Sequence, residues 1–176
     1  FSFFILFILK ENANIDKYFF FQGISSIISG IFFIVLIKIN YNLNFVINDL
    51  IDHYQKRRYA DAEKLSTQIT KSFPKSQLAW KILGAVLGTK GRWIDAEHAT
   101  KKAVELSPED AEAHTNLAVS LQELGRLNEA EASYNQVIAF KPEYALAHNN
   151  LGNTLKGLGR LDDAIASYNR AIALKP

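Results

Sequence analysis

The sequence predicts an all-α fold, an α-solenoid of repeated helix-turn-helix units that is preceded by a hydrophobic helix. Two observations lead to this prediction. The four prolines of the chain, Pro74, Pro108, Pro142 and Pro176, follow one another at intervals of 34 residues, and a fixed period of this length is typical of repeat proteins. In addition, twenty consecutive residues near the N-terminus carry no charge, as expected of a helix that crosses a lipid bilayer.

The composition excludes several classes of site. The chain has 176 residues, 20 basic and 18 acidic side chains, and no cysteine. Disulfides, thiolate metal sites and cysteine nucleophiles are therefore excluded, and the balanced charge predicts no nucleic-acid partner. Because the chain contains no methionine and stops on the last residue of a repeat, we expect a fragment whose neighbouring repeat units are missing.

Residues 1–45 form a hydrophobic N-terminal segment that differs in composition from the rest. Ten of the twelve phenylalanines lie here, whereas alanine occurs once, against nineteen times afterwards. Residues 18–37 are the candidate membrane helix, because twenty residues rise about 30 Å, the thickness of a hydrocarbon core. The alternative is that a wrongly placed gene start in AT-rich DNA produced this segment.

The charges beside residues 18–37 favour a membrane-associated protein whose repeats are cytoplasmic. Lys38 and the basic run at residues 56–58 lie on the side of the repeats, in agreement with the positive-inside rule. Lys10 and Lys17 on the other side weaken this argument. If residues 1–45 are not native, a soluble cytoplasmic protein is expected instead.

Residues 46–74 predict a degenerate helix pair. Tyr59, Ala62, Ile69 and Pro74 keep the spacing of a second helix of the repeat. Arg57, however, stands where the later units have glycine, so we expect two helices that match the repeat more loosely.

Three complete units follow, at residues 75–108, 109–142 and 143–176. Each contains two amphipathic patterns with apolar residues at three- and four-residue steps, typical of packed helices. Glycine is expected to end each first helix, and small residues to allow the two helices to approach closely. The turn glycines are Gly91, Gly125 and Gly159, and the small residues are Gly84, Ala118 and Gly152 on the first helices and Ala96, Ala130 and Ala164 on the second.

These positions resemble the tetratricopeptide repeat (TPR) family over about three quarters of the chain. The matching residues are Trp80, Leu83, Gly84, Gly91, Ala96, Ala103 and Pro108, then Leu117, Gly125, Ala130, Tyr134 and Pro142, then Leu151, Gly152, Gly159, Ala164, Tyr168, Ala171 and Pro176. Departures are Ala118 in place of glycine, Thr100 in place of an aromatic residue and Val137 in place of alanine. The resemblance implies a right-handed α-solenoid whose first helices line a concave groove.

The sequence indicates no catalytic constellation, metal site or cofactor. His114 and His148 occupy one position in successive units. A zinc ion would need both nitrogens about 2 Å away, whereas neighbouring helices pack about 8–10 Å apart. We therefore interpret both histidines as packing residues.

The best candidate site is a repeated set of polar side chains on the first helices. Asn116 and Asn150 are 34 residues apart, and an amide can both donate to and accept from a peptide backbone. The resemblance to the repeats of protein O-GlcNAc transferases, whose groove asparagines bind substrate peptide, implies that these two face the groove. Ile82 breaks the series in the first unit. The remaining candidates are Asn149, Asn153, Thr115, Gln122, Glu123 and Lys156.

The predicted function is a non-enzymatic interaction module that binds a peptide or protein segment in the groove and is tethered by residues 18–37. One alternative is the substrate-recognition arm of a larger enzyme, such as an O-GlcNAc-type glycosyltransferase whose catalytic domain lies outside this sequence. Another is a purely architectural array whose repeats contact other copies of themselves. A further alternative is that asparagine is simply common at the groove positions.

Overall fold

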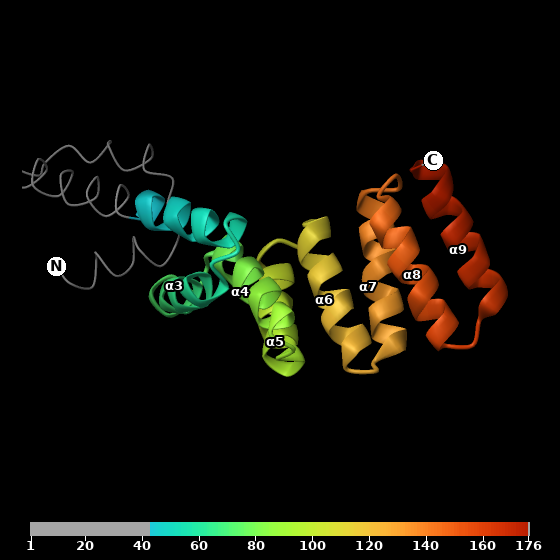
Figure 1. Ribbon diagram of the computed structural model, residues 1–176, viewed down its shortest axis with the longest axis horizontal. Coiled ribbons are helices and arrows are strands. Elements are labelled where there is room, and N and C mark those ends of the chain that lie inside the picture. Colours follow the sequence, from blue (N-terminus) through green and yellow to red (C-terminus); the bar gives the residue numbers. More distant parts are fainter. Residues whose placement is uncertain (1–42, 176) are drawn as a thin grey trace, which may run out of the picture. The chain divides into compact units, whose positions relative to one another are not determined.

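The computed structural model describes residues 43–175, and all regular secondary structure in this range is helical (Figure 1). The all-α prediction is thus confirmed for the described part of the chain. Its helices are residues 43–55, α3 (Tyr59–Ser72), α4 (Gln77–Thr89), α5 (Trp93–Leu106), α6 (Ala111–Glu123), α7 (Leu127–Phe140), α8 (Ala145–Gly157) and α9 (Leu161–Leu174).

The candidate membrane helix at residues 18–37 lies outside the described residues. Between residues 43 and 175, no helix is both long and apolar enough to cross a membrane.

Val46–Pro176 form one compact unit in which the helices pack in sequence order. From α3 to α9 each helix lies against the next one, and α4 also lies against α6. Figure 1 shows this succession of helices along the unit. Contacts between sequence neighbours are characteristic of solenoids, in which each repeat covers the apolar face of the one before.

The turns inside the units depend on left-handed backbone. Gly91, Gly125 and Gly159 have φ angles of +70°, +74° and +77°, which glycine adopts without the steric cost of a Cβ atom. The predicted role of these glycines is therefore confirmed. Arg57 has the same conformation, with φ +58°, although it carries a side chain. The degenerate pair thus keeps the turn of the later units with a strained residue.

Small residues allow the two helices of a unit to touch. A Cβ atom on Gly84 would lie 2.4 Å from Thr100 Cγ2, and one on Gly152 would lie 2.6 Å from Tyr168 Cε1. Both distances are shorter than real contacts, so a Cβ atom at either position would force the neighbouring side chain to move. The alanines predicted on the second helices, Ala96, Ala130 and Ala164, are at most 2% exposed.

The degenerate pair shares a core with the first complete unit. Leu50 and Ala62 are fully buried and belong to one cluster with Ile69, Ala79 and Val86 of α3 and α4. At the other end, α9 buries only Ala164. Its outer face, with Leu161, Ile165 and Ile172, is 56–64% exposed.

Candidate functional site

The eight predicted site residues lie on two first helices, α6 and α8. Helix α6 carries Thr115, Asn116, Gln122 and Glu123, and α8 carries Asn149, Asn150, Asn153 and Lys156. A direct contact joins the two helices: Thr154 Oγ1 of α8 lies 3.0 Å from Gln122 Oε1 and donates to it. Thr154 is completely buried, and its hydroxyl also lies 3.0 Å from the Asn150 carbonyl oxygen of its own helix, so the link between α6 and α8 is one branch of a shared hydrogen bond.

Three of the predicted residues are already engaged within the protein. Thr115 is 6% exposed, and its hydroxyl donates to the Ala111 carbonyl oxygen at 2.7 Å. Gln122 accepts from Thr154. Asn153 Oδ1 accepts from the Tyr168 hydroxyl at 2.8 Å, so its side chain lies toward α9. These three side chains shape the wall of the site more than they offer hydrogen bonds to a ligand.

The other five predicted site residues are available at the surface. Asn149, Glu123 and Lys156 are exposed, and Asn116 and Asn150 are half-buried. Among the described residues, the side chains of Asn116, Asn149 and Lys156 have no hydrogen-bond partner. A half-buried amide that no protein group satisfies is suited to a ligand that supplies both a donor and an acceptor, such as a peptide backbone.

A charged cluster between α4 and α6 continues the same row of first helices. Lys81 Nζ donates to Asp110 Oδ2 at 3.0 Å and to Glu112 Oε2 at 2.8 Å, and Gln77 Nε2 donates to Asp110 Oδ2 at 2.7 Å. The Lys81 and Asp110 side chains are only 15% and 20% exposed.

Burial and pairing act in opposite directions on the pKa values of this cluster. Burial alone would lower the pKa of Lys81, but the hydrogen bonds to Glu112 and Asp110 raise it above its usual value. Burial alone would raise the pKa of Asp110, but hydrogen bonds from Lys81 and the Ala113 amide lower it. Both groups are therefore held in their charged forms.

Sequence reasoning overlooked Asp110, although a signal for it existed. The residue precedes α6, and its Oδ1 accepts from the backbone N–H groups of Glu112 and Ala113 at 2.9 and 3.1 Å. An aspartate directly before an amphipathic helix is a typical N-cap. Its second oxygen binds α4, and that cross-unit role has no local signature.

The repeated histidines have a structural role. His114 Nε2 lies 2.9 Å from the Pro108 carbonyl oxygen, and His148 Nε2 lies 2.8 Å from that of Pro142. Trp80 Nε1 donates to the carbonyl oxygen of Pro74 at 2.8 Å in the same way. One ring N–H in each unit thus satisfies the carbonyl of the unit's preceding proline, consistent with packing residues.

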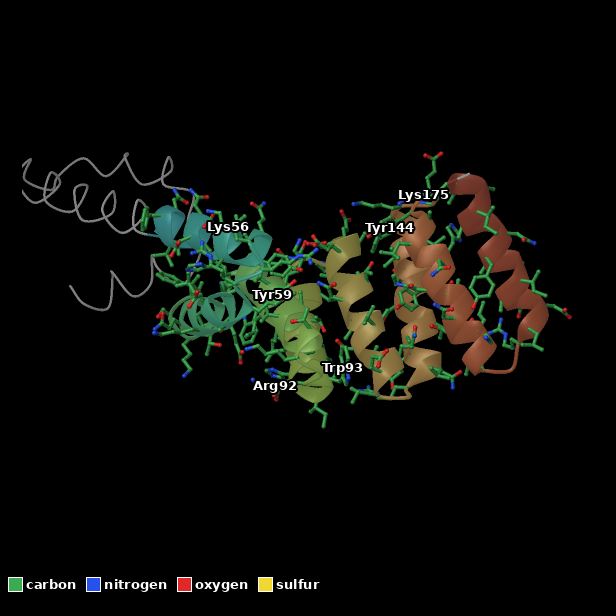
Figure 2. All side chains as sticks on the ribbon, viewed as in Figure 1. Lys56, Tyr59, Arg92, Trp93, Tyr144 and Lys175 are labelled. Carbon is green, nitrogen blue, oxygen red and sulfur yellow. The ribbon has the colours of Figure 1, made fainter. Side chains whose placement is uncertain are left out.

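A repeated set of ion pairs lies at the turn inside each complete unit. Arg92, Arg126 and Arg160 each pair with an acid three residues later and with a glutamate of the preceding second helix; these partners are Asp95 and Glu63, Glu129 and Glu97, and Asp163 and Glu131. In Figure 2, Arg92 and Trp93 lie at the turn between α4 and α5, whereas Tyr144 lies at the opposite edge. Exposed pairs of this kind contribute little stability individually.

One group of potential metal ligands occurs among the described residues: Asp49, Asp52 and His53. Asp52 accepts from Lys56 Nζ at 2.8 Å and also pairs with Arg58. One of the three ligands is thus already committed to two cations, and the group is best explained as an ion-pair network at the end of the first helix.

Four family models with the descriptions "TPR repeat" and "Tetratricopeptide repeat" match the chain. They match residues 51–111, 99–132, 120–159 and 145–176. Together the matches run without a break from residue 51 to residue 176. The protein is therefore a helical repeat protein, and it belongs to the tetratricopeptide repeat family. No curated protein matches the sequence at a significant level.

Solved structures with the same fold include three informative relatives. MamA has a TM-score of 0.72 at 21% identity, over 80% of this chain and 82% of that one. A thermophilic TPR protein of Thermus thermophilus has a TM-score of 0.65 at 23% identity, over 75% and 74%. A mutant O-GlcNAc transferase of Thermobaculum terrenum has a TM-score of 0.59 at 24% identity, over 64% of this chain and 22% of that one. At these identities the likeness establishes the fold.

Proposed function

We propose that this protein is a non-enzymatic module that binds an extended peptide or protein segment along the first helices α4, α6 and α8. The observation that carries the proposal is the pair Asn116 and Asn150: half-buried amides at equivalent positions of successive units. Each can hold one backbone amide of a ligand with two hydrogen bonds. The TPR fold supports protein–protein interaction in general, and the two amides are the reason for proposing the surface of α6 and α8 as the place of binding.

The surroundings of the asparagines favour a preformed surface. Thr154 links α8 to α6, and Lys81 with Asp110 links α6 to α4. Links of this kind between neighbouring first helices reduce the conformational entropy that is lost when a ligand binds. Asn149 and Lys156 add exposed polar contacts beside this row on α8.

The experiment uses peptides selected from a random linear library against the full chain. Asn116→Ala and Asn150→Ala are compared with Asn135→Ala and Asn169→Ala, two exposed asparagines that are also 34 residues apart but lie on the second helices α7 and α9. Loss of one amide contact should weaken binding about fivefold, since a hydrogen bond contributes about 1 kcal/mol. Equal losses from both pairs of variants would overturn the proposed site.

Membrane tethering through residues 18–37 belongs to the same proposal, as does a cytoplasmic location of the repeats. The support is the uncharged run of twenty residues in the sequence. Extraction of the natural product with alkaline carbonate tests it: a tethered protein stays in the membrane pellet. Mass spectrometry of the N-terminus, with a product that begins near residue 46, would instead support a soluble cytoplasmic protein.

The role as recognition arm of a glycosyltransferase is the second candidate. Its specific support is the similarity in fold to the repeats of the Thermobaculum terrenum enzyme. Sequencing of the gene beyond the codon for Pro176 distinguishes the two: a nucleotide-sugar domain supports the enzyme arm, and further repeats followed by a stop codon support the free-standing module.

A further inference from the structure

Helix α9 exposes an apolar face whose equivalent on α7 is covered. The face consists of Leu161, Ile165, Tyr168 and Ile172, which follow one another at steps of four, three and four residues. Its three aliphatic residues are 56–64% exposed. Helix α8 packs against the other side of α9, as Figure 1 shows. A continuous exposed apolar stripe of this kind is typical of an interaction surface.

Helix α7 shows how such a face is covered inside the array. Its equivalent residues are Leu127, Glu131, Tyr134 and Ile138. Tyr134 is 0% exposed and, with Ile138, belongs to a cluster that includes Leu151 and Leu155 of α8. Glu131 accepts from Arg160, in the turn after α8, at 2.7 Å. The cover of a second helix is therefore apolar along most of its length and ionic at one position.

The ionic position is different in α9. Each earlier second helix has a glutamate there that pairs with the arginine of the following turn; the pairs are Glu63 with Arg92, Glu97 with Arg126 and Glu131 with Arg160. In α9 the residue is Ile165. A following unit of the same kind would place its turn arginine against this isoleucine, and burial of an unpaired charge is strongly unfavourable. The face of α9 instead fits a partner that is apolar at this point.

The face is complementary to a second copy of itself. Its alternating steps of four and three residues are those of a two-helix coiled coil. Asp162 and Lys175 are exposed and lie six residues before and seven residues after Tyr168. Neither makes an ion pair with any residue that the structure describes. In an antiparallel pair centred on Tyr168, Asp162 of each copy lies beside Lys175 of the other, and the helix dipoles are opposed. A parallel pair would bring like charges together.

We propose that this face of α9 is a self-association surface on which α9 of a second copy packs antiparallel. Ile165 of each copy then lies against Ile172 of the other, and the two ion pairs between Asp162 and Lys175 set the direction. One helix from each copy makes a small interface, so a weak and reversible dimer is expected. The surface lies apart from the first helices, and the inference does not depend on the proposed peptide binding.

Cysteine cross-linking tests the pairing, because the chain contains no cysteine of its own. Asn169→Cys places a thiol next to Tyr168, near the centre of the proposed pair. Asn135→Cys places one at the equivalent exposed position of α7 and is the matched control. Both variants of the full chain are oxidised in a mild detergent, since residues 1–45 are strongly apolar. A disulfide-linked dimer should form with Asn169→Cys only; equal yields, or no dimer from Asn169→Cys, would overturn the proposal.

Charge reversal tests the direction and the identity of the partner. In sedimentation equilibrium, Asp162→Lys and Lys175→Asp should each weaken dimerisation about five- to tenfold, because symmetry removes two ion pairs at once. The chain that carries both changes should dimerise as well as the original, since both pairs form again with reversed signs. A double variant as weak as the single ones would rule out antiparallel pairing of two copies.

The apolar part of the surface is tested at Ile165. Ile165→Glu restores the glutamate of the earlier units and should weaken dimerisation at least about tenfold, because it buries a charge without a partner. Ile94→Glu, at a 73% exposed isoleucine of α5, is the control and should have no effect. Circular dichroism confirms that each variant keeps its helices. If a further repeat unit of the natural gene product covers α9, Asn169→Cys in that product will give no dimer, which contradicts the inference.

Discussion

Lys81 and Asp110 meet across two repeat units: Lys81 Nζ of α4 donates to the carboxylate that caps α6, at 3.0 Å. The same carboxylate accepts two backbone N–H groups at the start of α6. Asp110 therefore performs two tasks, helix capping and inter-unit attachment. Among α3–α9, only α6 begins with a side-chain cap.

Substitution of Asp110 separates these two tasks. Asp110→Ala should lower the free energy of unfolding by about 2 kcal/mol, because it removes the cap and one charged partner of Lys81. Asp110→Asn keeps an oxygen for the cap and should cost about 1 kcal/mol. Urea denaturation of the full chain measures both. Glu109→Ala, at the neighbouring exposed acid, serves as control, and an equal loss from all three variants would contradict the assignment.

The same pair predicts how stability depends on pH. The pKa of Asp110 in the folded protein lies below its usual value of 3.8. Between the two values the unfolded chain binds more protons than the folded one, so stability decreases as the pH falls through this window. The stabilising contribution is present above the unfolded pKa and lost below the folded one. Unfolding midpoints in acid should decline less steeply for Asp110→Asn; parallel curves would refute the linkage.

At alkaline pH, stability depends on pH with the opposite sign. The pKa of Lys81 is raised above 10.5 in the folded protein, so its contribution is present at lower pH and disappears as the pH rises through the folded value. Lys81→Met should therefore flatten the loss of stability above pH 10.5 relative to the unmodified chain. Thermal unfolding followed by circular dichroism measures this; Lys64→Met, at a lysine of α3 that makes no such pair, should leave the slope unchanged.

Arg57 offers a stabilising change. Because its φ of +58° is unfavourable for a residue with a Cβ atom, Arg57→Gly should raise the free energy of unfolding by about 1 kcal/mol. Gly125→Ala makes the reverse change at the equivalent turn and should lower it by about 1 kcal/mol. Thermal unfolding of both variants provides the comparison. Destabilisation by Arg57→Gly would show that the interactions of the Arg57 side chain stabilise the fold by more than its positive φ destabilises it.

Gly152 tests the close packing of α8 on α9. Gly152→Ala places a methyl group 2.6 Å from the Tyr168 ring, and overpacking of this kind costs about 1–3 kcal/mol. Gly157→Ala is the matched control, since its new methyl would meet the end of the flexible Leu127 side chain at 2.9 Å. Denaturant titration should show a clearly lower free energy of unfolding for Gly152→Ala only. An equal decrease for both variants would indicate a general effect of alanine in α8.

Much of the fold could be predicted because the repeat places each residue type by its local role. Steric rules that act within a single unit explain the glycines with positive φ, the buried alanines and the proline after each second helix. The all-α class, the helix pairs and the family therefore follow from the 34-residue spacing.

The candidate site could be predicted only as a surface of α6 and α8. Helical spacing places Asn116, Asn150 and Asn153 on first helices, but it does not determine what their side chains bind. In the structure Asn153 binds Tyr168, while Asn116 has no partner among the described residues. The difference depends on a contact with another helix, which spacing within one helix cannot reveal.

By itself, the sequence determined the helical repeat, its turns and the helices that carry the polar candidates, because these depend on steric and packing rules that act within about one unit. The tertiary structure decided which polar groups are satisfied. Lys81 finds Asp110 29 residues away, Thr154 finds Gln122 32 residues away, and the Tyr134 hydroxyl finds no ordinary partner among the described residues. Hydrogen bonds depend on distances of a few tenths of an ångström between atoms of different helices, and only the packed array sets those distances.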